Sequence, residues 1–563
     1  MRFPTLQTIP AARQTVDIFL GYHQGSRIAP GEFADMKNLS ARSYPALRPR
    51  KTRGKFLEGA ALAGLLAKDS LCYIDGRDFV MGGYHVDLGL SPGEKQLVSM
   101  GAKVVILPDR KWVNTLDLTQ FGNIDAEVTP VNPVSVTLCS LDGGAYENFP
   151  LGDTPPQAPE NGALWMDTSQ RPHVLKVWSS QSELWSDIPA TYLKLYSPGI
   201  GAAFRQYDGV TISGAQEQAL NAAHVIWDIG EDYLVISGIL DGPVEETSLT
   251  VARKMPEVDF LVESGNRLWG CRYGLSLDGQ VVNEIYASKL GDFTNWNCFM
   301  GLSTDSYAAS CGTDGPFTGA VSYLGHPLFF KETCLHKVYG SYPASFQIQT
   351  TQLRGVERGS GKSLCQVGEI LYYKSPAGVC AYDGSLPVVV SQALGQTRYR
   401  NAVAGTDGEK LYISMEGPAL FVYDPGKNLW HKEDDLQVRQ FAFCRGSLYA
   451  LTEDRILTME GDDEKAVSWM AVTGPLGLGD PDRRYITRLT LGLGMAVDAQ
   501  LAIFIRYDGA GDWQSLAFLR GRREPCFDLP LRPRRCSHLE LKLEGRGDVT
   551  LYSLTQTLEG GES

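Results

Sequence analysis

Residues 354–363, RGVERGSGKS, have the residue types of a phosphate-binding loop. Such a loop has the spacing G-x-x-x-x-G-K-[ST], in which backbone N–H groups surround the phosphates while Lys and Ser/Thr reach the terminal phosphate and the metal. If Gly361, Lys362 and Ser363 end this motif, its first glycine belongs at position 356, where the chain has Val356. The following SLCQVGEILYYKS has the pattern of a strand pair rather than a helix. We therefore predict a turn here and no nucleotide site.

Other segments that resemble catalytic motifs also lack the spacing that those motifs require. The sialidase Asp-box, S-x-D-x-G-x-x-W, is missed by SLDGQVV at 276–282 and by YDGAGDW at 507–513. Adjacent carboxylates, such as Asp434 with Asp435, point to opposite faces of a strand and cannot converge on one substrate atom. The sequence contains no G-x-S-x-G elbow, no H-x-x-x-H and no C-x-x-C. We predict no catalytic residue, cofactor or metal site, and a protein that is not an enzyme.

Composition indicates a large globular β protein. The 563 residues suffice for two to four domains, and 43% hydrophobic with 21% charged residues is ordinary for a folded chain. The 60 glycines and the many aromatic residues favour short strands joined by turns. The sequence predicts neither a membrane span nor a signal peptide, and its eleven scattered cysteines indicate free thiols formed in a reducing cytoplasm. A formal net charge of −13 argues against a surface that seeks nucleic acid as a whole.

Apolar runs separated by Gly/Asp turns recur along the chain. Leu328, Leu371, Leu411 and Leu448 begin such runs at spacings of 43, 40 and 37 residues, and Leu71 and Val104 begin two earlier ones 33 residues apart. A period near 40 residues with about four strands per unit is typical of a β-propeller blade. We predict an all-β fold with a propeller of about six to seven blades. A pair of stacked β-sandwiches is the alternative.

The pattern is interrupted in the middle of the chain and again near its end. Residues 131–257 predict small inserted β modules, in which Trp165, Trp178 and Trp185 either stack on sugar or form a small core of their own. Residues 466–563 alternate apolar and polar side chains, which predicts a C-terminal β-sandwich. We expect the rest of the chain to form an extended N-terminal arm at 1–55 and propeller blades at 56–130 and 258–465.

Several segments resemble the stabilisation or nozzle-type tail proteins of tailed phages and prophages. The resemblance rests on the N-L…Y-P-x-L-x-x-R pattern at Asn38, Leu39, Tyr44, Pro45, Leu47 and Arg50, and on NRLWGC…GDFTNWNCF…GTDGPFTG…LFFKETCLHKVYG in the propeller region. The sequence of 354–384 also follows that family's rhythm, and 154–178 resembles a small strand module of phage tail and fibre proteins. The insertion and the C-terminal sandwich depart from the minimal family.

This resemblance implies a structural virion protein, made in the host cytoplasm, that forms a ring at the head–tail junction or tail nozzle. The ring, of six or twelve copies, would contact portal, adaptor or other tail proteins, continue the DNA channel and retain the genome without sequence-specific binding. An acidic lumen would let the DNA slide, although acidity also serves solubility. Expected contacts between subunits are Tyr44, Pro45, Leu47, Arg50, Arg532, Arg534 and Arg535. The alternatives are a receptor-binding or baseplate component that holds host cell-wall carbohydrate and, more distantly, a propeller glycosidase.

Overall fold

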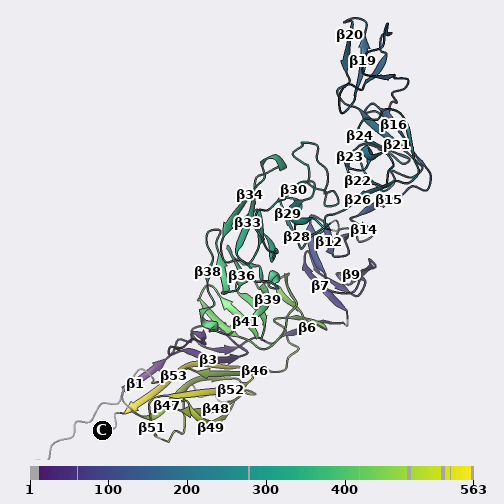
Figure 1. The fold of residues 1–563 in the computed structure, drawn as a ribbon. Helices are drawn as coiled ribbons and strands as arrows, with labels where there is room; N and C mark the ends of the chain where they lie inside the picture. Colours follow the sequence, from purple (N-terminus) through teal and green to yellow (C-terminus); the bar gives the residue numbers. More distant parts are fainter. Residues whose placement is uncertain are drawn as a thin grey trace, which may run out of the picture.

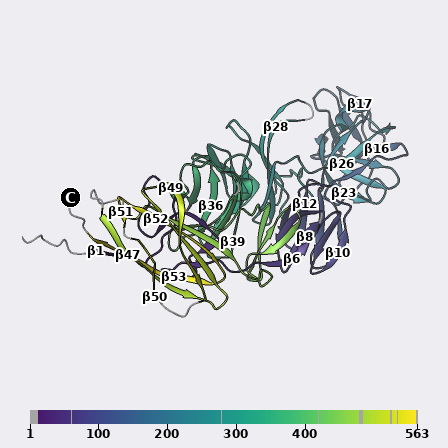
Figure 2. The same ribbon diagram turned by 90° about the horizontal axis from the view of Figure 1, so that it is seen from below.

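The computed structural model describes residues 12–59, 61–276, 279–417, 419–477, 484–521, 526–532 and 534–559. Three bodies built of β-strands follow one another along an elongated molecule (Figure 1). A sandwich occupies one end, a propeller the middle, and a domain inserted into the propeller the other end. The view turned by 90° shows the same order (Figure 2). The long axis therefore has two structurally different ends.

The propeller has seven four-stranded antiparallel blades within the described residues, which confirms the predicted all-β propeller. Blades 1 to 3 consist of β7 (Leu62–Ala67), β8 (Leu71–Asp75), β9 (Asp78–Met81) and β10 (Tyr84–Asp87); β11 (Gln96–Met100), β12 (Lys103–Leu107), β13 (Lys111–Asn114) and β14 (Phe121–Asn123); and β27 (Phe260–Ser264), β28 (Arg267–Leu275), β29 (Val281–Ala287) and β30 (Tyr307–Ser310). Blades 4 and 5 consist of β31 (Gly319–Tyr323), β32 (His326–Phe330), β33 (Cys334–Tyr339) and β34 (Gln347–Gln352); and β35 (Cys365–Val367), β36 (Ile370–Ser375), β37 (Gly378–Tyr382) and β38 (Val388–Val389). Blades 6 and 7 consist of β39 (Arg400–Thr406), β40 (Leu411–Glu416), β41 (Ala419–Asp424) and β42 (Leu429–Lys432); and β43 (Gln440–Cys444), β44 (Ser447–Leu451), β45 (Arg455–Thr458) and β6 (Gly54–Glu58).

The repeat found in the sequence corresponds to one strand of each blade. All six residues that begin the repeated runs lie in the second strand of a blade and are buried: Leu71, Val104, Leu328, Leu371, Leu411 and Leu448. Second strands pack between neighbouring blades on both faces, so they read as continuous apolar runs rather than alternating ones. The spacing of these runs therefore measures the length of a blade.

The ring is closed by a strand from the N-terminal part of the chain. β6 pairs with β45 as the outer strand of blade 7, and the first strands of blades 7 and 1 are in contact. This pairing joins residues about 400 positions apart in sequence. The distant strand supplies the fourth strand of blade 7 and becomes the outer edge of that blade.

A buried ionic cluster lies directly before the closing strand. Arg53 donates to Asp434 Oδ2 at 2.6 Å and to Glu433 Oε2 at 2.8 Å. Arg50 donates to the two carboxylate oxygens of Glu464 at 2.7 and 3.0 Å. Burial raises the pKa of Glu433, and the guanidinium groups of Arg53 and Arg50 act against this rise. The cluster thus fixes the chain at the point where it passes from the sandwich into the propeller.

Both ends of the chain build the sandwich. One sheet contains β1 (Ala12–Val16), β53 (Val549–Glu559), β47 (Arg484–Met495), β50 (Cys526–Asp528) and β51 (Arg534–Cys536). The other contains, in order, β2 (Gly21–Tyr22), β3 (Glu32–Lys37), β46 (Ser468–Thr473), β52 (Leu539–Arg546), β48 (Gln500–Tyr507) and β49 (Ala510–Arg520). β4 (Leu39–Ser40) and β5 (Arg48–Pro49) form a separate pair. The segment expected as an extended arm, 1–55, is therefore paired within its own chain over its described part, because its backbone groups complete the sandwich sheets and then the propeller.

One hydrophobic core joins the sandwich to the propeller. Buried side chains of both sandwich sheets continue into blades 5 and 6. The ring of Tyr22 in β2 packs against Phe421 in β41 with centroids 5.4 Å apart, and Trp430 in β42 donates from Nε1 to the carbonyl oxygen of Val390 at 2.8 Å. Because this core is shared, the sandwich packs as a rigid extension of blade 6.

The inserted domain leaves the propeller between blades 2 and 3. Its eight-stranded sheet surrounds a single core and has the order β15 (Ala126–Val128), β26 (Thr250–Arg253), β22 (Gly209–Ser213), β23 (Ala223–Gly230), β24 (Tyr233–Ser237), β21 (Tyr192–Tyr196), β16 (Val134–Cys139) and β25 (Val244–Glu246). A nested sheet contains β17 (Leu151–Gly152), β18 (Leu164–Asp167), β19 (Val174–Ser179) and β20 (Leu184–Asp187). Entry and exit strands lie side by side, because Ala126 pairs with Arg253. An insertion of this geometry leaves the blades on either side intact.

Helix is scarce in the described chain. Four short 3₁₀ turns occur: η1 (Gln218–Leu220), η2 (Pro343–Ser345), η3 (Gly361–Ser363) and η4 (Gln392–Leu394). Within the described ranges, no helix has the length and apolar character needed to cross a membrane.

We expect Arg53→Ala to lower stability by about 3–5 kcal/mol, because it leaves the buried carboxylates of Glu433 and Asp434 without their closest cation. Thermal unfolding followed by circular dichroism measures this as a fall in the first unfolding midpoint. Arg455→Ala, which removes an exposed ion pair with Asp454, is the matched control and should leave the midpoint nearly unchanged. Equal shifts in the two variants would contradict a special role for the buried cluster.

Candidate functional site

The glycine-rich stretch ends at the centre of the propeller. Lys362 lies in η3, directly before the first strand of blade 5, and its ammonium group forms an ion pair with Glu94. It also donates to the carbonyl oxygen of Arg439 at 3.2 Å. Glu94 and Arg439 precede the first strands of blades 2 and 7, which are not neighbours of blade 5 in the ring. Lys362 therefore links three blades across the mouth of the central channel.

The neighbours of Lys362 are used by the fold itself. The Ser363 hydroxyl is buried, donates to the carbonyl oxygen of Ser360 at 2.6 Å and accepts from the N–H of Lys374 at 2.9 Å. A Cβ atom at Gly361 would lie 2.8 Å from the carbonyl oxygen of Thr318, so close packing requires glycine here. These contacts account for the Gly-Lys-Ser sequence by packing and blade connection.

A cavity of about 600 Å³ opens beside this ion pair. Its walls combine apolar side chains, among them Leu97, Leu107 and Phe260, with charged groups. Arg272 is held by Asp259 at 2.7 Å and by Glu257 at 3.2 Å. The carboxylates of Glu94, Glu257 and Asp259 at this mouth therefore form ion pairs with cations of the same chain.

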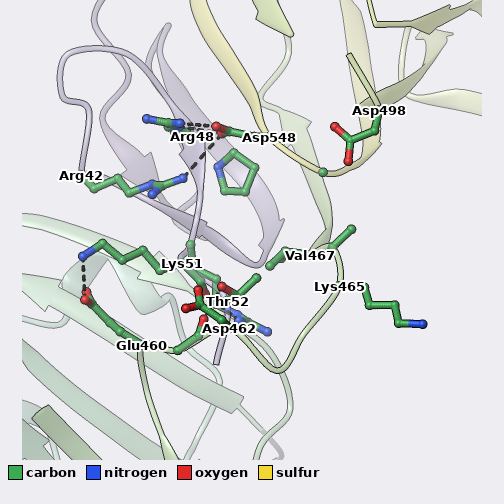
Figure 3. A pocket seen from close by; sticks show the side chains of 15 residues that line it. Arg42, Arg48, Lys51, Thr52, Glu460, Asp462, Lys465, Val467, Asp498 and Asp548 are labelled. Carbon is green, nitrogen blue, oxygen red and sulfur yellow. Dashed lines mark hydrogen bonds and ion pairs between the residues drawn. The ribbon is translucent and has the colours of Figure 1, made fainter. Parts of the chain in front are cut away.

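Where the sandwich meets the propeller, a second cleft of about 480 Å³ is lined by Arg42 and residues 48–52 (Figure 3). Arg48 forms a close ion pair with Asp548, and Arg42 approaches the same carboxylate at 3.5 Å. Burial and the nearby Arg48 lower the pKa of Arg42. Lys51 pairs with Glu460 at 2.6 Å. These charges tie the N-terminal segment to the C-terminal strands and to the end of blade 7.

The residues expected at contacts between subunits separate into two groups. Leu47 is buried and bridges to Leu551, and Arg50 belongs to the buried ionic cluster, so both serve the chain's own fold. Tyr44 and Pro45 remain exposed.

The expected arginine cluster lies at the sandwich end of the molecule. Arg532, Arg534 and Arg535 all have exposed side chains. Arg534 pairs through its backbone with Ile486 of β47 and lies over the Tyr507 ring at 5.1 Å. Contacts of these residues with a neighbouring subunit stay predictions.

The three tryptophans of the nested sheet lie together on one of its faces. Trp165 and Trp178 each place their ring centroid 5.5 Å from that of Trp185, with interplanar angles of 67° and 56°. Trp165 is 5% exposed and donates from Nε1 to the carbonyl oxygen of Gly152 at 3.2 Å, whereas Trp178 and Trp185 keep part of their surface in solvent. The opposite face, with Met166 and Leu175, packs into the core of the inserted domain. The rings pack as a small core of which two members reach the surface.

Patterns that the sequence suggested for other chemistry do not assemble into a site. The first Asp-box-like segment, 276–282, lies partly outside the described residues, and YDGAGDW forms the turn between β48 and β49. No group of three or more His, Cys, Asp or Glu residues that could hold a metal ion occurs in the part of the chain that the structure describes.

Sequence reasoning missed the partners of Lys362 and Arg53. Glu94 and Arg439 are separated from Lys362 by 268 and 77 positions, and Glu433 is 380 positions from Arg53. No local pattern connects residues this far apart, and only an explicit order of blades around the ring could have paired them.

No protein-family model matches this chain, and no curated protein matches its sequence. Among solved structures, BamB from Moraxella catarrhalis is similar with a TM-score of 0.29 at 10% identity, over 73% of this chain and 96% of that one. Sqt1 from Saccharomyces cerevisiae is similar with a TM-score of 0.28 at 9% identity, over 72% and 96%. YCF48 from Cyanidioschyzon merolae is similar with a TM-score of 0.23 at 9% identity, over 52% and 89%. All three are β-propellers, and likenesses this weak carry no argument about activity.

We expect the protein to bind no MgATP at micromolar concentrations, and Lys362→Ala to change neither this result nor the melting midpoint by much, because the ion pair with Glu94 is half exposed. Isothermal titration calorimetry and thermal unfolding measure the two quantities. Micromolar binding by the natural protein that the variant loses would show that the glycine-rich segment is a nucleotide site.

Proposed function

We propose that this protein is a structural subunit of the tail of a tailed phage or prophage. In this proposal, copies form a ring at the head–tail junction or the tail nozzle, continue the DNA channel and hold the genome until ejection. The protein acts mechanically and contacts portal, adaptor or other tail proteins at the two faces of the ring. It is made in the host cytoplasm and resides in the virion.

The observation that carries the proposal is the arrangement of the three bodies (Figure 1). The sandwich shares its core with blade 6, and the inserted domain hydrogen-bonds to blade 3, where Asn295 accepts from the N–H of Gly209 and donates to the carbonyl oxygen of Tyr207. A subunit of a closed ring must present two different, complementary surfaces. A rigid rod with unlike ends supplies such surfaces, and the resemblance of the N-terminal and blade sequences to phage nozzle proteins supports the same role.

The centre of each propeller is not the DNA channel in this proposal. Lys362, Glu94 and Arg439 bridge the mouth of the propeller, where a DNA duplex would have to pass. The channel would instead lie on the axis of the ring, between several copies.

A second candidate function is a receptor-binding or baseplate component. It is favoured by the position of the nested sheet at the tip of the molecule, where Trp178 and Trp185 are partly exposed (Figure 1). Aromatic rings at a surface can stack on sugar rings of the host cell wall.

Electron microscopy of purified virions should place the protein in a ring around the DNA axis, with six or twelve copies. The subunits should follow one another around the channel, because their unlike surfaces require a rotational repeat. A location only at fibre tips, or absence from the particles, would contradict the proposal.

For the second candidate, Trp178→Ser with Trp185→Ser should abolish binding to purified host cell walls while particles still form. These point variants are preferable to deleting residues 145–200, which would remove β21 from the middle of the inserted sheet. Trp178→Phe with Trp185→Phe keeps aromatic surface and should retain binding, and Tyr84→Ser, at an exposed aromatic residue of blade 1, is the matched control. Unchanged cell-wall binding by the serine variant would exclude this role for the tryptophans.

A further inference from the structure

The charge of this protein is distributed unevenly along its length. Residues 126–253, the inserted domain, contain sixteen acidic and five basic side chains, a formal net charge of −11. Residues 1–49 and 466–563, whose described parts build the sandwich, contain eighteen basic and fifteen acidic side chains, a net charge of +3. The two domains lie at opposite ends of the molecule with the propeller between them (Figures 1 and 2). The rod is therefore an electrical dipole with a strongly acidic end.

The six-stranded sandwich sheet has an outer face rich in aromatic and basic side chains. Along β48, Leu501, Ile503 and Ile505 point into the core, so Phe504 and Arg506 point outward. Cations lie over the outward rings: Arg506 over Trp513 at 4.6 Å, Lys542 over Phe504 at 4.8 Å and Arg520 over Phe518 at 5.4 Å. Phe518 is 55% exposed. Arginine and aromatic side chains are the types that dominate the centres of protein interfaces.

Two cations at one edge of this face are available to a partner. Arg520 and Arg546 both lie in register with Gln500, so the three side chains form a row. Both arginines are exposed, and neither forms an ion pair with another described residue. Beside the row is a groove of about 700 Å³ that Phe518 and Ala502 line together with Lys37 and Lys465. The groove is also lined by Glu464 and Glu544, so the groove and the row together offer apolar surface bordered by charges among which cations are in excess.

The inserted domain has matching carboxylates. Glu147, Glu231 and Glu245 are exposed, and none of them forms an ion pair within the described residues. The inserted domain of the same chain cannot reach the sandwich, because the propeller separates them (Figure 1). Any contact between the acidic inserted domain and the sandwich face is therefore a contact between two copies.

We propose that the outer face of the six-stranded sandwich sheet docks the acidic inserted domain of a second copy of this chain. Contacts of this head-to-tail kind are heterologous, and they close into a ring when the rotation between copies divides a full turn. The inference rests on the proposed ring function and supplies the contact between its subunits. A protein partner fits this face better than DNA does, because Glu540 and Glu544 lie among its cations and pair with Arg506 and Lys542.

The test uses two full-length variants that reverse charge at opposite ends. The first carries Arg520→Glu and Arg546→Glu on the sandwich, and the second carries Glu147→Lys, Glu231→Lys and Glu245→Lys on the inserted domain. In sedimentation at low salt and about 100 µM, the natural protein should self-associate, and each variant alone should do so at least tenfold more weakly. Their mixture should associate again, because each variant retains the end that the other needs.

A matched control reverses two exposed arginines of blades 1 and 7, Arg77→Glu with Arg455→Glu, and should associate like the natural protein. The proposal is overturned if the natural protein stays monomeric under these conditions, or if the sandwich variant associates normally. It is also overturned if the mixture fails to associate although both variants melt like the natural protein. Loss of binding to a DNA duplex in the sandwich variant, with unchanged association, would assign this face to DNA instead.

The association measurements test the contact between copies, and they do so independently of whether the protein is found in virions. Head-to-tail association of a protein that is absent from virions would leave the contact standing and refute the proposed function. A ring in virions built by a protein whose variants all assemble normally would refute the contact and leave the function standing.

Discussion

The rest of this structure depends on closure of the propeller by β6. Because the closing strand comes from the N-terminal part of the chain, blade 7 is complete only where residues from both ends of the propeller sequence lie together. The segment before β6 belongs to the sandwich, and the chain after β45 runs back into the sandwich. Closure of the propeller therefore also brings the two halves of the sandwich together. Arg50 and Arg53, both buried, hold this crossing point with ion pairs to buried Glu433 and to the partly exposed Asp434 and Glu464. A buried pair is costly to break because each partner left alone is a desolvated charge.

Whether a strand could be predicted from the sequence depends on how many of its side chains are buried. Second strands of the blades are apolar on both faces, so Leu371 and Leu411 begin runs that stand out against the turns around them and reveal the period. The N-terminal strands carry no comparable signal: β2 has two residues, and β1 is mostly exposed, so the segment reads as an extended arm. Its pairing with β53 joins residues more than 500 positions apart, which no local pattern reports. The predicted propeller was confirmed, and the tertiary role of the arm needed the structure.

The same reasoning separates what could be predicted about the candidate sites. Spacing alone was enough to predict that Lys362 ends no phosphate loop. Lys362 lies over the channel and bonds to Glu94 and Arg439. This position follows from the order of the blades around a closed ring, which the sequence alone does not give. For the tryptophans, the structure shows three packed rings, of which Trp165 is buried and Trp178 and Trp185 are partly exposed. Stacking of these rings on sugar stays a prediction. Leu47 and Arg50, two residues of the N-terminal sequence pattern, hold the chain's own junction together.

Fusion of the sandwich to blade 6 through one core has a consequence for assembly. A flexible joint would let each copy adopt its own angle, and a ring of defined size requires that all copies share one. The core that runs from the sandwich into blades 5 and 6, and the hydrogen bonds of Asn295 with the inserted domain, fix both ends of the rod to the same rigid propeller. The angle between the sandwich face and the acidic domain is therefore a property of the folded subunit. If these two surfaces meet in neighbouring copies, that fixed angle, rather than an external template, determines how many subunits close the ring.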